Sequence, residues 1–362
     1  MKIGIYLGVI LLGICFSCKK DPVSRLESVD LLVLYGEDSC RFVQPDGKEM
    51  LVSNYKESSL GYDGMFLVKD QADGKWGYAD EDGNYLLPSV YRSASVFSEG
   101  KAWVVRQNEA PGLIDTKGRL KFTLRDAYET RIFRDGLAAY SLRNGKWGFV
   151  DGKGNTIIIP DYIAVTDFIN GIAAVCFRDN RWGYIRRDGS LIFDKKFETA
   201  FPFSQNSLAV VKEGGKYKVI NREGKEIFVS QGDKLLPDGK WFRILQAGKW
   251  GWCNEKGEII IKPVFEETGY FYDEGLAPVK IRKKWGYIDT KGRMKIKRQF
   301  REAYPFIGER AAVRVDNSYG FIDKSGRFIV NPQYNAISDD YLSQALQSSS
   351  YYNSVVTDVV RR

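Results

Sequence analysis

One recurring stretch decides the fold, and at residues 145–160 it reads GKWGFVDGKGNTIIIP. A glycine at this position, usually after an aromatic residue, returns about every 35 residues. These reference glycines are Gly77, Gly112, Gly148, Gly183, Gly251, Gly286 and Gly320, and five of them follow Trp76, Trp147, Trp182, Trp250 and Trp285. Arg41 and Lys218 take the glycine's place in two degenerate copies, so the chain contains about nine repeats.

A second glycine stands six residues after each reference position. These turn glycines are Gly47, Gly83, Gly118, Gly154, Gly189, Gly224, Gly257, Gly292 and Gly326. The residue before each turn glycine is Asp, Lys, Glu or Ser, and the pair stands between two short apolar runs. Because glycine accepts a positive φ without steric cost, this pattern predicts a tight hairpin in every repeat.

The strand before the turn has apolar side chains on both faces. In Trp147 to Val150 the two aromatic residues share one face, and Gly148 shares the other with Val150. We therefore expect both faces to be buried, and the glycine to allow close approach of a neighbouring ring. If Trp147 is a core residue, Trp147→Ala should cost about 3 to 5 kcal/mol of stability.

Further positions in the repeat predict two more strands. An aliphatic run follows the turn and often ends at a proline, which cannot donate to a ladder. An aromatic residue stands fourteen positions after the reference position at Tyr55, Tyr91, Tyr162, Phe197, Phe265, Phe300 and Tyr334. Alternating apolar residues then lead to the next repeat, as in 168–175 and 272–279. Three short strands in meander order, without a helix-length amphipathic stretch, predict an all-β chain.

The linked positions resemble the WG repeats of bacteria, also called KWG repeats. Lys146-Trp147-Gly148-Phe149 and Lys284-Trp285-Gly286-Tyr287 carry the likeness, together with the downstream glycine. The resemblance covers about residues 31–335 and departs at Pro111-Gly112, around Lys218 and in 229–241. It implies a β-repeat array, generally without an assigned activity and often exported or at the cell surface, and it supplies no catalytic residues.

The repeats admit two global arrangements. Stacked units can form an open β-solenoid or superhelix, or they can act as blades that close into a β-propeller. We favour the open form, because nine units exceed the usual blade number and about 35 residues is short for a four-stranded blade. Residues 336–362 are expected to form a C-terminal cap or flexible tail.

The N-terminus has the features of a signal peptide. Lys2 precedes an apolar run, residues 3–16, that is too short to span a bilayer and ends at Ser17-Cys18. This end resembles the lipobox of bacterial lipoproteins, in a loose form of the Bacteroidetes type; the alternative is a plain secretory signal. We expect removal of residues 1–17, lipidation of Cys18 and a tether over 18–30. With lysine after Cys18, the resemblance points to the outer membrane, with the periplasmic or surface face left open.

Composition restricts the chemistry. The sequence contains no histidine, which excludes His-based triads, His general bases and His metal ligands. Removing residues 1–17 takes away one lysine, so the net charge falls from +8 to a modest +7. An anionic glycan or acidic protein is a more fitting partner than nucleic acid for an exported chain. Cys40, Cys176 and Cys253 stand at unrelated repeat positions and are expected to be buried thiols rather than a disulfide framework.

Other candidate sites have structural explanations. Asp80, Asp82 and Gly83 resemble part of a calcium loop, but Tyr91 stands where the bidentate Glu is needed, so a turn is expected and no metal. The carboxylate pairs Glu266-Glu267, Asp273-Glu274 and Asp339-Asp340 could in principle serve hydrolysis. The many aromatic residues, loosely like those of choline-binding proteins, could bind sugars or cations, although core positions are expected. Trp103, Trp241 and Trp252 lie outside the repeated Trp position and are the weak ligand-binding candidates.

The sequence therefore predicts a non-enzymatic, lipid-anchored binding or scaffolding module of the cell envelope, without a cofactor. Its partner would be a protein or a glycan. The alternative is a carboxylate-based, glycan-directed hydrolase built on the repeat scaffold. Mutation of the closest carboxylates in a cleft distinguishes the two functions. If a preparation with hydrolase activity keeps that activity after the mutation, the carboxylate-based hydrolase is eliminated.

Overall fold

The protein is built from β-strands in every part that the structure describes. The computed structural model describes residues 32–337 except 36–39, 44–48, 54, 60–62, 81, 272–274 and 335, and no helix occurs among the described residues. The predicted signal peptide, Cys18, the tether over 18–30 and the tail from 338 onward lie outside these residues. The all-β prediction is confirmed.

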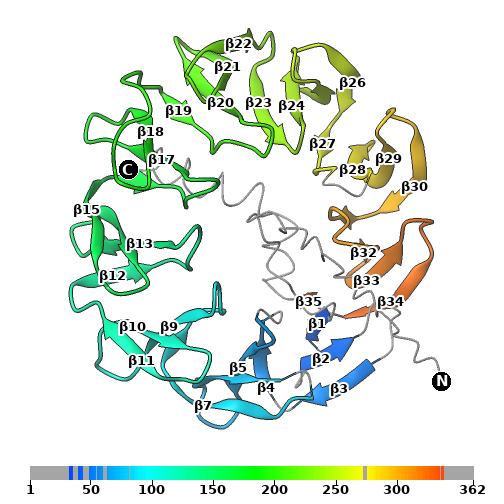
Figure 1. Cartoon of the computed structure of the whole chain (residues 1–362). Helices are drawn as coiled ribbons and strands as arrows, with labels where there is room; N and C mark the ends of the chain where they lie inside the picture. Colours follow the sequence, from blue (N-terminus) through cyan, green and yellow to red (C-terminus); the bar gives the residue numbers. More distant parts are fainter. Residues whose placement is uncertain are drawn as a thin grey trace, which may run out of the picture.

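The described strands form nine antiparallel sheets, arranged one after another in a ring (Figure 1). The first four sheets along the chain, in the order of neighbouring strands, are β3 (Glu49–Ser53), β2 (Cys40–Val43), β1 (Leu32–Tyr35) and β35 (Ala336–Ile337); β4 (Tyr55–Ser58), β5 (Phe66–Asp70), β6 (Trp76–Ala79) and β7 (Tyr85–Tyr91); β8 (Ser93–Ala94), β9 (Lys101–Val105), β10 (Gly112–Asp115) and β11 (Leu120–Thr123); and β12 (Ala127–Thr130), β13 (Leu137–Leu142), β14 (Trp147–Asp151) and β15 (Thr156–Tyr162).

The next five sheets follow the same plan. They are β16 (Ala164–Val165), β17 (Ile172–Cys176) and β18 (Trp182–Arg186); β19 (Thr199–Ala200), β20 (Leu208–Glu213), β21 (Lys216–Asn221) and β22 (Glu226–Val229); β23 (Lys234–Asp238), β24 (Trp241–Gln246), β25 (Lys249–Cys253) and β26 (Ile259–Phe265); β27 (Glu267–Thr268), β28 (Leu276–Ile281), β29 (Lys284–Asp289) and β30 (Met294–Phe300); and β31 (Glu302–Ala303), β32 (Arg310–Val315), β33 (Ser318–Asp323) and β34 (Phe328–Tyr334). We call each sheet a blade.

A fourth strand adds to the three that the sequence predicts. Eight of the nine described blades have four strands, because the short segment after the fourteenth-position aromatic residue pairs with the next long strand. In one blade, Ala164 and Val165 of β16 pair with Cys176 and Val175 of β17. That blade has three strands, since only isolated bridges connect residues after β18 to it. The short strand has only two residues in most blades, too few to stand out from a connecting loop in the sequence.

The two ends of the array meet in one blade. Leu34 and Tyr35 of β1 pair with Ile337 and Ala336 of β35, so the first and last described strands share a sheet. Together with the ring seen in Figure 1, this pairing gives the closed, propeller-like arrangement that the sequence analysis kept as its alternative to the open solenoid. The preference for an open form rests on nine units being more than the usual blade number and on about 35 residues being short for a four-stranded blade. In the structure a fourth strand of only two residues in most blades lets units of this length form four-stranded sheets.

The reference glycine is required by a bulge in the outer strand. Trp147 pairs with Tyr162 and Phe149 pairs with Ile158, so three residues of β15 lie opposite Gly148. A Cβ atom on Gly148 would lie 2.4 Å from the Ile158 carbonyl oxygen and 2.7 Å from the Pro160 nitrogen. The expected close approach is thus confirmed, but the approaching group is the backbone of the neighbouring strand rather than a ring.

The turn glycines have the predicted conformation. All of those that the structure describes have a positive φ, as in Gly154 with a φ of 93°. An Asp or Asn three residues before the turn glycine also fixes the hairpin: Asp151 Oδ1 accepts the N–H groups of Lys153 and Asn155. Gly154 contacts the Phe122 ring of the preceding blade, so the turn packs between blades as well.

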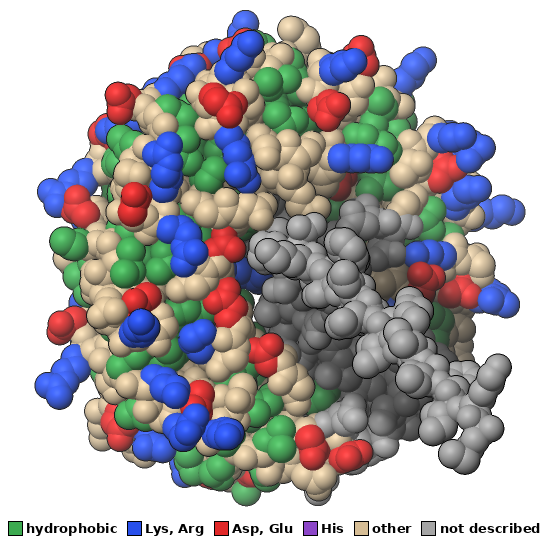
Figure 2. All heavy atoms as spheres, viewed as in Figure 1, with side chains coloured by type: hydrophobic (Ala, Val, Ile, Leu, Met, Phe, Trp, Pro, Cys, Tyr) green, Lys and Arg blue, Asp and Glu red, His purple; other side chains and the backbone are tan. Residues whose placement is uncertain are grey.

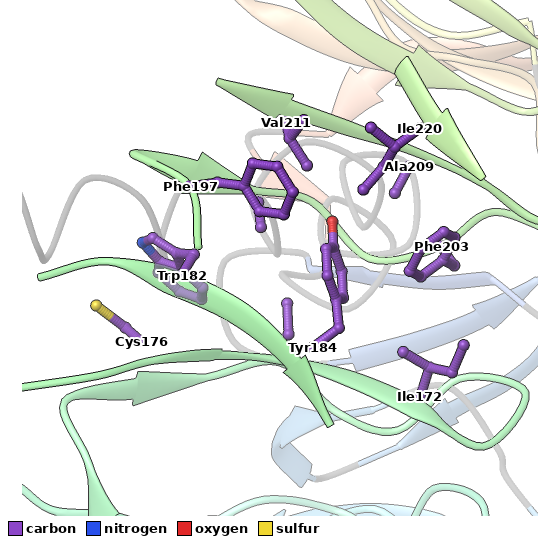
Figure 3. Close-up of a cluster of buried hydrophobic side chains, with 11 residues drawn as sticks. Ile172, Cys176, Trp182, Tyr184, Phe197, Phe203, Ala209, Val211 and Ile220 are labelled. Carbon is purple, nitrogen blue, oxygen red and sulfur yellow. The ribbon is translucent and has the colours of Figure 1, made fainter. Parts of the chain in front are cut away.

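The core lies between neighbouring blades. Figure 3 shows one cluster in which Tyr184 of β18 faces Phe203, together with Ala209 and Ile220 of the next blade. Tyr184 is fully buried and its hydroxyl donates to the Phe201 carbonyl oxygen at 2.6 Å. The same hydrogen bond, to the residue 17 positions on, recurs at Tyr78 and Tyr287. In these three blades the second aromatic residue of the WG strand therefore joins its blade to the next.

Candidate functional site

The tryptophans of the WG strands lie at the edge of the core rather than inside it. Trp182 is buried, whereas Trp76, Trp147, Trp250 and Trp285 are half-buried. The prediction of two fully buried faces is therefore wrong for these four indoles. The strand pairing places each of them at the end of its blade, where the fourteenth-position aromatic residue is the cross-strand partner.

A basic side chain covers many of these rings. Lys69 Nζ lies 5.2 Å from the Trp76 ring centroid, and Lys280 Nζ lies 5.8 Å from that of Trp285. Each lysine is also the cross-strand neighbour of its tryptophan. Such stacking contributes about 0.5 to 1 kcal/mol at exposed sites.

An acidic side chain completes the arrangement from the third strand. Lys280 Nζ contacts Glu267 at 2.5 Å, so a carboxylate, an ammonium and an indole lie in a row across β27, β28 and β29. The same row of acid, base and aromatic residue recurs as Glu57, Lys69 and Trp76; Glu198, Lys212 and Tyr217; and Glu302, Arg314 and Tyr319. The protein's own cation thus takes the position over these rings that a cationic ligand would use.

Arginines extend this pattern from one blade to the next. The Arg131 guanidinium lies 4.4 Å from the Trp147 ring centroid and donates to the Val165 carbonyl oxygen of the following blade. Arg243 lies 5.7 Å from the Trp250 centroid and donates to the Thr268 carbonyl oxygen in the same way. The WG tryptophans thus take part in joining blades.

The tryptophans outside the repeated position are also packed into the fold. Trp103 is 3% exposed, stacks on Phe133 and donates its indole N–H to the Arg131 carbonyl oxygen. Trp252 is completely buried, and Trp241 is half-buried against Phe271. Neither Trp103 nor Trp252 presents its ring to solvent, so their assignment as ligand-binding residues has no support in the geometry.

The residues around Trp252 form a buried polar cluster that the sequence analysis missed. Asp238, 4% exposed, accepts the Trp252 indole N–H at 2.7 Å and the Phe271 backbone N–H at 3.1 Å. The guanidinium of Arg243 lies 3.7 Å from the Tyr270 ring centroid. The only sequence signal was the irregularity of 229–241, where Pro237-Asp238-Gly239 replaces the usual aromatic and acidic residues.

Burial raises the pKa of Asp238 to about 6, although the Arg243 charge and the two hydrogen bonds act in the opposite direction. A perturbed carboxyl is a candidate functional group when it lies in a cleft. Asp238 instead lies inside the fold and ties Trp252 of its own blade to Phe271 of the next, which is a structural role.

This pKa predicts that the protein becomes more stable as the pH falls from 7 to 5. The folded carboxyl takes up a proton near pH 6, whereas the unfolded one does so near 3.9, so protonation favours the folded state by about 1 kcal/mol over this range. Urea unfolding at pH 5, 6 and 7 measures this gain. Asp238→Asn should abolish it.

Asp151→Asn is the control for that experiment. Burial raises the pKa of the Asp151 carboxyl, but hydrogen bonds from Asn155 and from backbone N–H groups lower it further, so the net pKa lies below its usual value. Asp151 is therefore ionised at both pH values and its variant should keep the gain. A gain that persists in Asp238→Asn would assign the pH dependence to another group.

The hairpin tips carry carboxylates that connect consecutive blades. Asp63, Glu99 and Asp135 lie at these tips with φ between 51° and 53°. Asp63 accepts the Gly100 N–H at 2.9 Å, Glu99 accepts that of Gly136, and Asp135 accepts that of Gly171 at 2.8 Å. Figure 1 shows the hairpins of this region reaching toward the centre of the ring. The carboxylate at each of these tips thus binds the backbone of the next tip along the chain.

The two carboxylates of the pair Glu266-Glu267 have different structural roles. Glu266 accepts the backbone N–H groups of Lys283 and Arg282, which lower its pKa, while Glu267 pairs with Lys280. A general acid needs a raised pKa, so this pair does not have the arrangement of a glycosidase. Asp273-Glu274 and Asp339-Asp340 lie outside the described residues.

The remaining candidates also have structural roles. Asp80 accepts the backbone N–H groups of Asp82 and Asn84, which confirms a turn at this sequence. Cys176 and Cys253 are free and buried, as predicted, and burial raises their pKa values to about 11 and about 12. The side chain of Cys40 is outside the described part. Among the described residues, no group of three metal-ligating side chains occurs, and no helix is long and apolar enough to cross a bilayer.

Comparison with known families agrees with the repeat geometry. The sequence model of the family described as "WG containing repeat" matches residues 76–109, 147–180, 182–217, 250–285, 285–319 and 319–341, more than half of the chain. The chain belongs to this WG repeat family. The unmatched stretches of the WG repeat region include the degenerate copy at Pro111-Gly112 and the irregular 229–241, yet both segments form blades.

Solved structures similar to this WG repeat protein have low sequence identity to it, and the first of those named below shares its fold. A structure described as the crystal structure of the eukaryotic initiation factor is 12% identical, with a TM-score of 0.62, and the match covers 85% of this chain and 97% of that one. BamB from Moraxella catarrhalis is 10% identical with a TM-score of 0.40, over 83% and 93% of the two chains. The computationally designed Ika8 protein is 12% identical with a TM-score of 0.38, over 84% and 96%. A comparison with curated proteins found no match.

Proposed function

We propose that this WG repeat protein is a non-enzymatic binding or scaffolding module, anchored by lipid at the cell envelope, whose partner is a protein or a glycan. The observation that carries this proposal is that the repeated polar and aromatic side chains contact one another within and between blades, where they stabilise the fold. The acid, base and aromatic rows hold strands together, and the tip carboxylates hold neighbouring blades. What faces the solvent is a repeated surface of turns and outer strands.

The outer strands support a binding role. Large apolar side chains are exposed on the last strand of most blades, among them Leu86 on β7, Ile159 on β15 and Val264 on β26. Ile159 is 77% exposed. Because they recur from blade to blade, these side chains can offer a partner many shallow contacts along the array.

A ligand search tests the binding role. The full chain, immobilised and exposed to envelope extracts and a glycan array, should retain a protein or glycan that is recovered unchanged. Turnover of a retained glycan, lost on mutation of a single carboxylate, would replace the proposal with the hydrolase alternative. Retention of nothing from either source would refute the binding role.

The lipid anchor has a separate test. Mass spectrometry of the N-terminal peptide should show that the mature chain begins at Cys18 with attached acyl chains, and membrane fractionation should place it with the outer membrane. Several acyl chains give stable attachment, so Cys18→Ala should move the protein to the soluble fraction. An unmodified N-terminus at another residue would indicate the plain secretory signal instead.

A further inference from the structure

Much of the positive charge of the chain lies in one segment of the sequence. From Lys280 to Arg301 the sequence has ten basic residues and one acidic residue, a net charge of +9, whereas the whole chain has +8. The rest of the chain is therefore close to neutral. This segment contains the end of β28 and the whole of β29 and β30, which belong to one blade.

Six of these side chains have no ion pair recorded in the described part of the chain. We call them the basic edge, and they are Arg282, Lys283, Lys284, Lys291, Lys297 and Arg298. The other four are engaged: Arg293 and Lys295 contact Asp289, Lys280 contacts Glu267, and Arg301 donates to Asn317. All six residues of the basic edge are exposed.

The basic edge extends along the whole length of the blade. Arg282 and Lys283 form the turn at one end, between β28 and β29, and Lys284 is the first residue of β29. Lys291 lies in the turn at the other end, between β29 and β30. Lys297 and Arg298 lie between these ends on β30, the outermost strand. In Figure 2, blue side chains gather on the rim where Figure 1 places β29 and β30.

The equivalent strands of other blades do not carry this charge. β15 reads TIIIPDY, β34 reads FIVNPQY and β30 reads MKIKRQF. Arg298 takes the place of Pro160 and Pro332, as its backbone nitrogen has the same close approach to the reference glycine. Because the repeat tolerates an apolar outer strand elsewhere, the fold does not require these charges.

We propose that the basic edge binds an anionic polysaccharide. This inference rests on the proposed function and specifies the class of ligand. The exposed cations lie at both ends of the blade and on its outermost strand, so positive charge extends along the blade, and a linear polymer with a charge on each unit can follow it. Among the exposed large apolar residues of the described chain, Met294 is the one on this blade, so no exposed ring is offered for stacking nucleic-acid bases.

Binding of the full chain to polygalacturonate tests the inference, with neutral dextran as the uncharged reference. The dissociation constant should rise with salt, because exposed charges are screened within about 10 Å at 0.1 M. Combined Lys291→Gln, Lys297→Gln and Arg298→Gln should raise it at least about fivefold, as expected for the loss of three exposed ion pairs.

The matched control removes three exposed charges from other blades. Lys117→Gln, Arg125→Gln and Lys153→Gln lower the net charge equally and should leave the dissociation constant unchanged. Equal losses in both triple variants would show a general charge effect and overturn the inference. So would absence of binding, or tighter binding to a single-stranded oligonucleotide or to phosphatidylglycerol vesicles than to the polysaccharide. If the ligand search yields a partner whose retention the basic-edge variant does not affect, the proposed function stands and this inference fails.

Discussion

Phe149→Ala should lower the free energy of unfolding by about 4 kcal/mol, twice the loss expected for Trp147→Ala in the same strand. Phe149 is 1% exposed and its ring lies 4.7 Å from that of Phe168 in the next blade, so truncation removes a buried ring and leaves a cavity between blades. Trp147 is half-buried beneath Arg131, and its loss should cost about 2 kcal/mol. Urea unfolding of the two variants measures both values.

The order of these two losses is what the structure predicts. Tyr184→Ala serves as a second test, since Tyr184 occupies the equivalent position and also loses its hydrogen bond to Phe201. A loss for Trp147→Ala that equals or exceeds that for Phe149→Ala would show that the first aromatic residue is the core residue. That was the expectation from the sequence, at about 3 to 5 kcal/mol for Trp147.

The repeat spacing was sufficient to predict the hairpins and the all-β class. Tight turns have a local cause, because Asp151 and Gly154 satisfy the backbone by themselves. Which aromatic residue becomes buried has a non-local cause. Alternation places Trp147 and Phe149 on one face, but the packing of the next blade decides that Phe149 contacts Phe168 while Trp147 lies at the blade's end.

Closure of the ring depends on the angle between neighbouring blades, which the sequence of a single repeat does not reveal. The angle between neighbouring blades follows from contacts such as that of Gly154 with Phe122, and a slight change in it separates a ring from a superhelix. The sequence has no feature that fixes the sum of these angles over nine units. The pairing of β1 with β35 shows that the first and last described strands meet.

The buried cluster around Asp238 was unpredictable for a related reason. Trp252 is a ligand candidate in the sequence because it lies outside the repeated Trp position. In the structure its indole N–H replaces the tyrosine hydroxyl as a donor, and Asp238 replaces the backbone carbonyl as the acceptor. Two irregularities 14 residues apart compensate each other, and this is visible only when β23 and β25 are placed in the same blade.

Gly148→Ala should cost about 3 kcal/mol of stability. The φ of Gly148 is not in the left-handed region, so alanine suits the local backbone, and the cost comes from contact alone. The new Cβ would lie 2.4 Å from the Ile158 carbonyl oxygen, a backbone atom that can move only if the bulge of β15 changes register. Thermal and urea unfolding should both show the loss.

Gly183→Ala is the matched control at the same repeat position. In that blade the outer strand is missing from the described sheet, and the added Cβ would meet the edge of the Phe177 ring at 2.7 Å instead of a backbone. A side chain can shift where a paired strand cannot, so Gly183→Ala should cost no more than about 1 kcal/mol. Equal losses in the two variants would mean that the glycine is kept for its strand conformation, and the bulge would no longer explain why the repeat has glycine after its aromatic residue.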